Sequence, residues 1–195
     1  MKHTLRRGLF SLAIIVLAAA AASAGVLAWR ALHPPPQWTA APGAPPVAAQ
    51  QPPALRVGER RPDFTLPDTT QTPRSVSEFD GKLLIVNFWA TWCPPCLEEI
   101  PAFVRMQHAY AERGVQFLGV ALDAGDEVRA FMREHAVNYP SVYGGHEAIA
   151  LSKAYGNRIG ALPFTVVVGR DGTVLSMHQG VFHEADLRAV IDAHL

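Results

Sequence analysis

The stretch KLLIVNFWA, Lys82 to Ala90, constrains the fold of this chain more than any other. A short run that is apolar at successive positions is typical of a central strand covered on both faces of a sheet. A second such run, VQFLGVAL at Val115 to Leu122, follows after a segment long enough for a helix. Two buried strands separated in this way predict a β-α-β unit.

The rest of the chain from Leu55 onward predicts further strands and helices around this unit. The segment from Asp63 to Val76 offers two short strands around a turn, and Asp171-Gly172 is expected to turn a hairpin after Pro163. The pattern is β-α-β followed by β-β-α, so we expect an α/β domain with a mixed sheet flanked by helices. The predicted helices are Pro95 to Arg113 closed by Gly114, Glu127 to His135 capped by Asp126, His146 to Tyr155, and Glu184 to Leu195.

The composition fits one globular domain and gives no support for a nucleic-acid partner. The chain has 195 residues, of which 49% are hydrophobic, and a mean hydropathy of +0.10, which is enough to build a core. Seventeen basic residues balance seventeen acidic ones, so there is no strong overall charge. The two cysteines cannot form a scaffold of several disulfides, so they are available for chemistry.

The first residues predict export and a membrane anchor. Basic residues in the segment 1–7, expected to be cytoplasmic, precede an uncharged run from Gly8 to Trp29. As a helix this run is roughly 33 Å long, about the thickness of a bilayer core. The alternative is a signal peptide cleaved after Ala24, because Ala22-Ser23-Ala24 fits a small-residue cleavage pattern. Both interpretations place the domain outside the cytoplasm.

The segment 30–54 is rich in proline, alanine and glutamine and is interpreted as a linker. Sequences such as HPPPQW and APGAPP favour extended polyproline II and bury too little apolar surface to fold. At full extension this segment reaches up to ~75 Å. The domain that it carries is predicted to span 55–195.

Cys93 and Cys96 stand where the first buried strand gives way to a helix. The N-H groups and dipole of the first helical turn favour the thiolate of Cys93, since such positions commonly lower a cysteine pKa from about 8.5 to roughly 3.5–7.5. Pro94 and Pro95 suit the first helical positions. Cys96 lies one turn away, at roughly 5–6 Å between Cβ atoms, so the pair can form a disulfide.

Other roles for the two cysteines fit the sequence less well. A structural disulfide that closes so short a loop restricts the unfolded chain only modestly. A zinc site needs four ligands, and there is no second C-x-x-C; HEAIA, from His146 to Ala150, departs from the H-E-x-x-H pattern. A C-x-x-C that opens a helix after a buried strand favours redox chemistry.

The stretches NFWATWCPPCLEEIP, FDGK and ALPFTVVVGRDGTVL resemble the thioredoxin-fold thiol-disulfide oxidoreductases of the TlpA/ResA type, which are tethered to membranes. The resemblance covers residues 55–195. It implies that Cys93 is the exposed nucleophile and Cys96 the resolving thiol. It also implies that Pro163 is a cis-proline beside the active site, with the backbone of Leu162 pairing with an extended substrate. Trp92 is expected to offer partners an apolar surface.

A carboxylate is the remaining candidate of the site. Thioredoxin carries a buried aspartate where this chain has Asn87, so the resemblance points instead to Glu99 for proton transfer at the cysteines. Glu99 follows Cys96 by three residues and shares its helix face. Partial burial would raise its pKa into a useful range. The alternative is that Glu98 and Glu99 only complement the helix N-terminus.

These features predict a membrane-tethered thiol-disulfide oxidoreductase that reduces client proteins and needs no organic cofactor. The resemblance implies a bacterial inner-membrane protein with its domain in the periplasm or extracytoplasmic space, recharged by a membrane electron donor. Apocytochrome c and copper-centre proteins are typical clients of the family. The alternatives are a disulfide-forming oxidant, a carrier that holds Cu(I) with its thiols, and a peroxidase.

Overall fold

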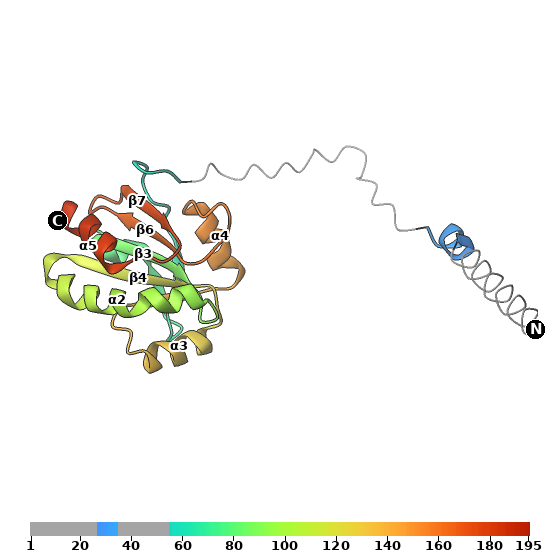
Figure 1. The fold of residues 1–195 in the computed structure, drawn as a ribbon, viewed down its shortest axis with the longest axis horizontal. Coiled ribbons are helices and arrows are strands. Elements are labelled where there is room, and N and C mark those ends of the chain that lie inside the picture. The colour runs from blue at the N-terminus through green and yellow to red at the C-terminus, as the bar shows by residue number, and fades with distance from the viewer. Residues whose placement is uncertain (1–26, 35–54) are drawn as a thin grey trace, which may run out of the picture. The chain divides into compact units, whose positions relative to one another are not determined.

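A five-stranded mixed sheet forms the centre of the unit 50–195 (Figure 1). The structure is a computed structural model that describes residues 27–34 and 55–195. The strand order is β5-β4-β3-β6-β7, with β3 parallel to β4 and antiparallel to β6. The strands are β3 (Leu83–Trp89), β4 (Val115–Ala121), β5 (Ser141–Tyr143), β6 (Phe164–Val168) and β7 (Val174–Gln179).

The predicted β-α-β unit and hairpin are confirmed. β4 follows β3 through a helix and pairs with it in parallel, and β6 and β7 pair antiparallel around a turn at Asp171-Gly172. β5 is not among the predicted strands. It has three residues and pairs with β4 at the edge of the sheet, which is too short for a recognisable pattern in sequence.

The segment before β3 also folds as predicted. β1 (Thr65–Pro67) and β2 (Pro73–Ser75) form a separate antiparallel pair. A short 3₁₀ helix, η1 (Val76–Phe79), follows and begins with a capping box. There the Ser75 hydroxyl accepts a backbone N-H of the first turn, and the Glu78 carboxylate accepts the Ser75 N-H.

The helices lie close to the predicted ranges, with two differences. The first helix begins at Pro94, and after Tyr110 it tightens into η2 before Gly114 ends it with φ 84°. Asp126 does not cap its helix: Ala124 occupies the N-cap position without a side-chain bond, and Asp126 pairs with Arg129 inside the first turn. The helices are α2 (Pro94–Tyr110), η2 (Ala111–Arg113), α3 (Gly125–Glu134), α4 (His146–Ala154) and α5 (Glu184–Ala193).

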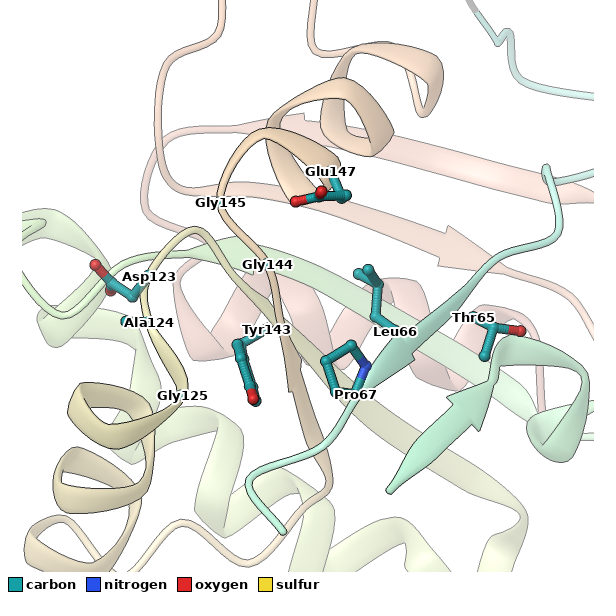
Figure 2. A pocket seen from close by; sticks show the side chains of 10 residues that line it. All are labelled: Thr65, Leu66, Pro67, Asp123, Ala124, Gly125, Tyr143, Gly144, Gly145 and Glu147. Atoms are coloured by element: carbon teal, nitrogen blue, oxygen red, sulfur yellow. The ribbon is translucent and has the colours of Figure 1, made fainter. Parts of the chain in front are cut away.

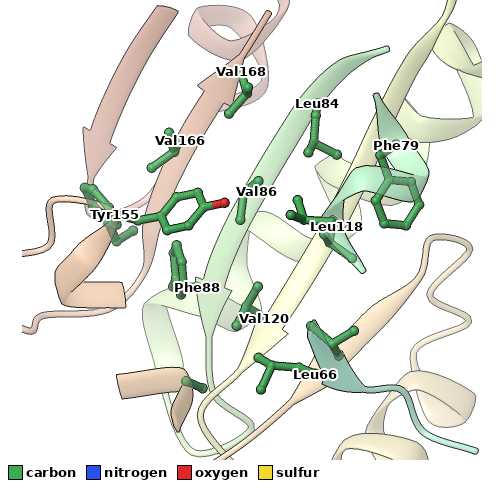
Figure 3. Close-up of a cluster of buried hydrophobic side chains, with 14 of the residues drawn as sticks. Leu66, Phe79, Leu84, Val86, Phe88, Leu118, Val120, Tyr155, Val166 and Val168 are labelled. Atoms are coloured by element: carbon green, nitrogen blue, oxygen red, sulfur yellow. The ribbon is translucent and has the colours of Figure 1, made fainter. Parts of the chain in front are cut away.

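Alternate residues of β3 face two different layers. Val86 and Phe88 point into a core shared with α4 and the β1–β2 segment, where Phe88 lies 5.5 Å from Tyr155 between ring centroids (Figure 3). Ile85 and Trp89 point to the other face, which α2, α3 and α5 cover. Asn87 lies between them in sequence and therefore also faces α2.

Gly119 permits a close approach on the face that α2 covers, and we expect Gly119→Ala to destabilise the fold. A Cβ at this position would clash with the Ser141 hydroxyl and lie 2.8 Å from Trp89 Nε1. The surrounding atoms must shift to make room for the added methyl group, and such overpacking lowers the free energy of unfolding by about 1–3 kcal/mol. Urea denaturation measures this change. Gly144→Ala is the matched control, because its Cβ meets only ordinary contacts; equal stability of the two variants would contradict the prediction.

The predicted anchor and linker fall mostly outside the described residues. Of the segments predicted over Gly8–Trp29 and 30–54, the structure describes residues 27–34, which are helical from 27 to 32. The helix continues past Arg30, where the linker is predicted to begin, and the first helix-breaking proline of that segment is Pro34. Within residues 27–34 and 55–195, no helix has both the length and the apolar character needed to cross a membrane.

Candidate active site

The two cysteines lie at the junction of β3 and α2 and are joined by a disulfide. Cys93 is the N-cap of α2, and Pro94 and Pro95 occupy the first two helical positions. The Cα atoms of Cys93 and Cys96 are 5.3 Å apart. The predicted pairing of these cysteines across one helical turn is confirmed.

The Cys93 sulfur has one backbone hydrogen-bond donor in the described part of the chain. Cys96 N donates to Cys93 Sγ over 3.3 Å. Pro94 and Pro95 have no N-H and so give no bond to this sulfur. The helix N-terminus therefore stabilises a Cys93 thiolate less than it would with ordinary residues at these two positions.

Both cysteines are buried in the disulfide form, which differs from the expectation of an exposed Cys93. Cys93 is 4% exposed and Cys96 0%. The two residues pack with Trp89, Ala90 and Ile100 in one cluster. The order of roles, with Cys93 as nucleophile and Cys96 as resolving thiol, stays a prediction.

Glu99 is buried behind the cysteines on the same face of α2. It is 1% exposed, and its two oxygens accept hydrogen bonds of 2.8 Å from Asn87 Nδ2 and the Phe182 backbone N-H. Burial raises the pKa of Glu99 to about 7, although both hydrogen bonds act to lower it. The carboxyl group can therefore take up or release a proton near neutral pH.

The alternative role for the two glutamates, as complements of the helix N-terminus, does not hold for Glu99. Neither glutamate lies in the first turn of α2, which has no acidic residue. Glu98 is exposed, whereas the carboxylate of Glu99 is bonded in the interior. Of the two glutamates, only Glu99 therefore has its carboxylate inside the site.

Asn87 connects Glu99 to β6. Its Nδ2 also donates to Thr165 Oγ1 over 3.0 Å, and Thr165 is its direct partner in the β3–β6 register. Within the described residues, Asn87 Oδ1 is buried without a hydrogen-bond partner. The position that holds an aspartate in thioredoxin is thus an amide that orients the carboxylate of Glu99.

The loop before β6 reaches the cysteine pair. The Leu162–Pro163 peptide bond is cis, as the resemblance implies. The Leu162 side chain packs against the cluster that holds Cys93 and Cys96. Trp92, the neighbour of Cys93 in the chain, is 67% exposed, which fits the predicted apolar surface beside the site.

The family comparison decides the class of protein. The family model described as Redoxin matches residues 56–191. The chain belongs to the redoxin family.

The relatives of this redoxin carry names that describe an enzyme. The thiol-disulfide oxidoreductase ResA of Geobacillus thermodenitrificans is 29% identical over 72% of this chain and 79% of the relative. The ResA of Bacillus thuringiensis subsp. konkukian is 30% identical over 65% of this chain and 71% of the relative. A putative thiol:disulfide interchange protein DsbE from Chlorobium tepidum has a TM-score of 0.65 at 29% identity, over 72% of this chain and 99% of that chain. This redoxin is a thiol-disulfide oxidoreductase with a thioredoxin-like α/β fold, as the sequence predicts.

A pocket of about 610 Å³ lies beside the active-site loop of this redoxin (Figure 2). It lies between β1, the loop after β4 and the segment from β5 to α4. Asp123, one of its lining residues, accepts the Thr91 N-H over 2.6 Å and so ties the pocket wall to the loop before Cys93. Sequence reasoning missed this contact because it joins loops after two different strands.

Two further partners of the site escape sequence reasoning. Thr165 and the Phe182 N-H hold Asn87 and Glu99, but their positions depend on the register of β6 and on the path of the chain after β7. The polar residue at Thr165 in an otherwise apolar strand is the only signal that the sequence offers. Among the residues that the structure describes, no group of three or more His, Cys, Asp and Glu side chains is placed to hold a metal ion.

Proposed function

We propose that this redoxin reduces disulfides of client proteins through Cys93 and Cys96. The Cys93 thiolate attacks one sulfur of the client disulfide, that bond breaks, and the other client sulfur leaves as a thiolate that takes up a proton. Cys96 then loses its proton and attacks Cys93 Sγ, which releases the second client thiol. The client gains two electrons and two protons, and the enzyme ends with the Cys93–Cys96 disulfide.

The observation that carries the direction of electron flow is the pair of prolines after Cys93. A dithiol is a strong oxidant when its reduced form is stabilised, chiefly through its thiolate. Here Pro94 and Pro95 leave Cys96 N-H as the single backbone donor to Cys93 Sγ in the described residues. The buried Glu99 carboxylate, when ionised, also opposes a nearby thiolate. Both features favour the disulfide form and so support the proposal that the dithiol acts as a reductant.

Glu99 is proposed as the proton acceptor for Cys96. Burial raises the pKa of Glu99 to about 7, so near neutral pH an ionised fraction is available to receive the thiol proton. Glu99 and Cys96 are three residues apart on α2 and both face the interior. Bulk water has little access to Cys96, so a buried base fits this step.

Leu162, Pro163 and Trp92 are proposed to bind the client. Neither the N-H nor the carbonyl oxygen of Leu162 has a hydrogen-bond partner in the described part of the chain. An extended client segment can pair with both groups, as a strand adds to a sheet edge. The exposed Trp92 ring offers apolar contact next to Cys93.

Export and tethering are proposed from the sequence. The uncharged run from Gly8 to Trp29 would anchor the chain, and the proline-rich segment 30–54 would hold the domain away from the membrane. In this arrangement the domain works outside the cytoplasm and is recharged by an electron donor in the same membrane. Apocytochrome c and copper-centre proteins are the proposed clients.

The redox potential of the cysteine pair tests the proposed direction. We expect equilibration with glutathione to give a potential of about −200 mV or lower, on the thioredoxin side of the known range. The oxidised fraction is measured by alkylating free thiols and weighing the protein by mass spectrometry. A potential near −120 mV, typical of a strong oxidant, would overturn the reductase proposal and favour disulfide formation.

The same preparation separates the alternatives that use other chemistry. A Cu(I) carrier would retain about one copper per reduced protein after purification without chelator. A peroxidase would turn over hydrogen peroxide with a thiol reductant. The proposed function predicts no retained copper and no turnover of hydrogen peroxide. It does predict catalysed reduction of a protein disulfide such as insulin.

A further inference from the structure

We infer that Gln179 and Asn157 are positioning residues that hold the loop 161–163 in the shape that receives a client backbone. The inference rests on the proposed function, in which Leu162 pairs with an extended client. It assigns a role in client binding to two amide side chains from different parts of the fold. Neither of them touches the reacting sulfurs.

Gln179 bridges the two carbonyl groups that flank Leu162. It is the last residue of β7, and its Nε2 donates to Ala161 O over 2.8 Å and to Pro163 O over 3.0 Å. A primary amide has two N-H donors, so one side chain satisfies both carbonyls. The backbone N-H of Gly180 also donates to Pro163 O, over 2.9 Å.

Asn157 holds the same loop from the side of α4. It is 1% exposed, and its Nδ2 donates to Ala161 O over 2.9 Å and to Ser152 Oγ over 2.9 Å. Ala161 O therefore accepts bonds from two different side chains. The loop is fixed to α4 through Asn157 and to β7 through Gln179.

We call the two side chains Gln179 and Asn157 the clamp. Its role follows from which backbone groups of the loop 161–163 are hydrogen-bonded and which are not. The carbonyls of Ala161 and Pro163 are satisfied inside the protein, whereas both backbone groups of Leu162 lack partners among the described residues. The loop is thus ordered before the client arrives, and the client does not have to supply the ordering free energy. Because the Leu162 side chain packs against the cysteine cluster, a segment paired with Leu162 lies beside Cys93.

The test compares two disulfides that differ in whether they have a peptide backbone. The full-length protein is assayed with a disulfide-linked dimer of a synthetic eight-residue peptide and with hydroxyethyl disulfide. Gln179→Glu keeps the size of the side chain but removes both donors. We expect it to raise KM for the peptide about fivefold, with kcat little changed, and to leave hydroxyethyl disulfide reduction within about twofold of the wild type.

Two further variants separate the clamp from effects of charge. Gln179→Met removes the donors without adding charge and should give the same rise in KM for the peptide. Gln71→Glu makes the same chemical change at an exposed position of the β1–β2 turn, where no side-chain hydrogen bond is present among the described residues, and should leave both substrates unaffected. Thermal unfolding checks that each variant is folded.

The outcomes distinguish this inference from the proposed function. An unchanged KM for the peptide in Gln179→Glu, or an equal loss with both disulfides, would overturn the clamp while the reductase function stands. A wild-type protein that fails to reduce the peptide at all would remove the proposed function, and the inference with it. A rise in KM confined to the peptide supports the clamp.

Discussion

Cys93→Ser is expected to lower kcat/KM for disulfide reduction by about 10³-fold or more, the loss typical of removing a catalytic nucleophile. The serine hydroxyl is not ionised near neutral pH and does not attack a disulfide. Cys96 is not expected to take over the attack, because it is 0% exposed within the first turn of α2. Insulin reduction with dithiothreitol as electron source, corrected for the uncatalysed rate, measures the loss.

Cys96→Ser is the matched control for this prediction. It keeps the attacking thiol but removes the group that resolves the mixed disulfide, so the reaction should stall with the client bound to Cys93. Mass spectrometry of the trapped species locates the bond. If Cys93→Ser kept more than about a tenth of the activity, or if clients were trapped on Cys96 in the Cys93→Ser variant, the assignment of roles would be reversed.

The sequence was sufficient for the centre of the fold because its strands are long and apolar. The runs that became β3 and β4 are buried on both faces of the sheet, and such runs have few alternative placements. β5 has three residues, and its pairing depends on where the chain returns after α3. The predicted cap at Asp126 failed because the helix begins earlier, after Ala124, where no side chain caps it.

In the candidate site, too, contacts within one element could be predicted from the sequence, whereas contacts between distant segments could not. The three-residue spacing of Cys96 and Glu99 follows from the helix period, and burial of Glu99 on the face of the cysteines agrees with it. The donors to Glu99 come from β3 and from the segment after β7, so only the three-dimensional structure assigns them. The residues alone do not predict the cis geometry at Pro163, since most X-Pro bonds are trans. The expectation came from the family resemblance, and the structure has this bond in the cis form.

Glu99→Gln is expected to change how stability depends on pH. In the folded protein the pKa of Glu99 is about 7, whereas its ordinary value is 4.5. Between these two pH values the folded state binds more protons than the unfolded state, so wild-type stability falls as the pH rises through this window. The difference between the two pKa values corresponds to about 3 kcal/mol in the free energy of unfolding, and the glutamine side chain does not titrate. The free energy of unfolding of the variant relative to that of the wild type should therefore rise by about this amount between pH 4 and pH 8.

Urea denaturation of the oxidised proteins at the two pH values measures this gain. The interior can accommodate glutamine, because rotation of the Asn87 amide presents its unpartnered Oδ1 to the new Nε2-H, and Thr165 can then donate its hydroxyl proton. Glu98→Gln removes an exposed carboxylate one residue away and should show no such change with pH. A difference between Glu99→Gln and wild type that stays constant with pH would mean that folding leaves the pKa of Glu99 unchanged. Glu99 would then be largely ionised near neutral pH in the unbound enzyme and unsuited to shuttle a proton for Cys96. Suppose Glu99→Gln gains stability at the higher pH and also loses the pH dependence of mixed-disulfide resolution. The unfavourable burial of the Glu99 carboxylate would then be linked to its proposed role in proton transfer.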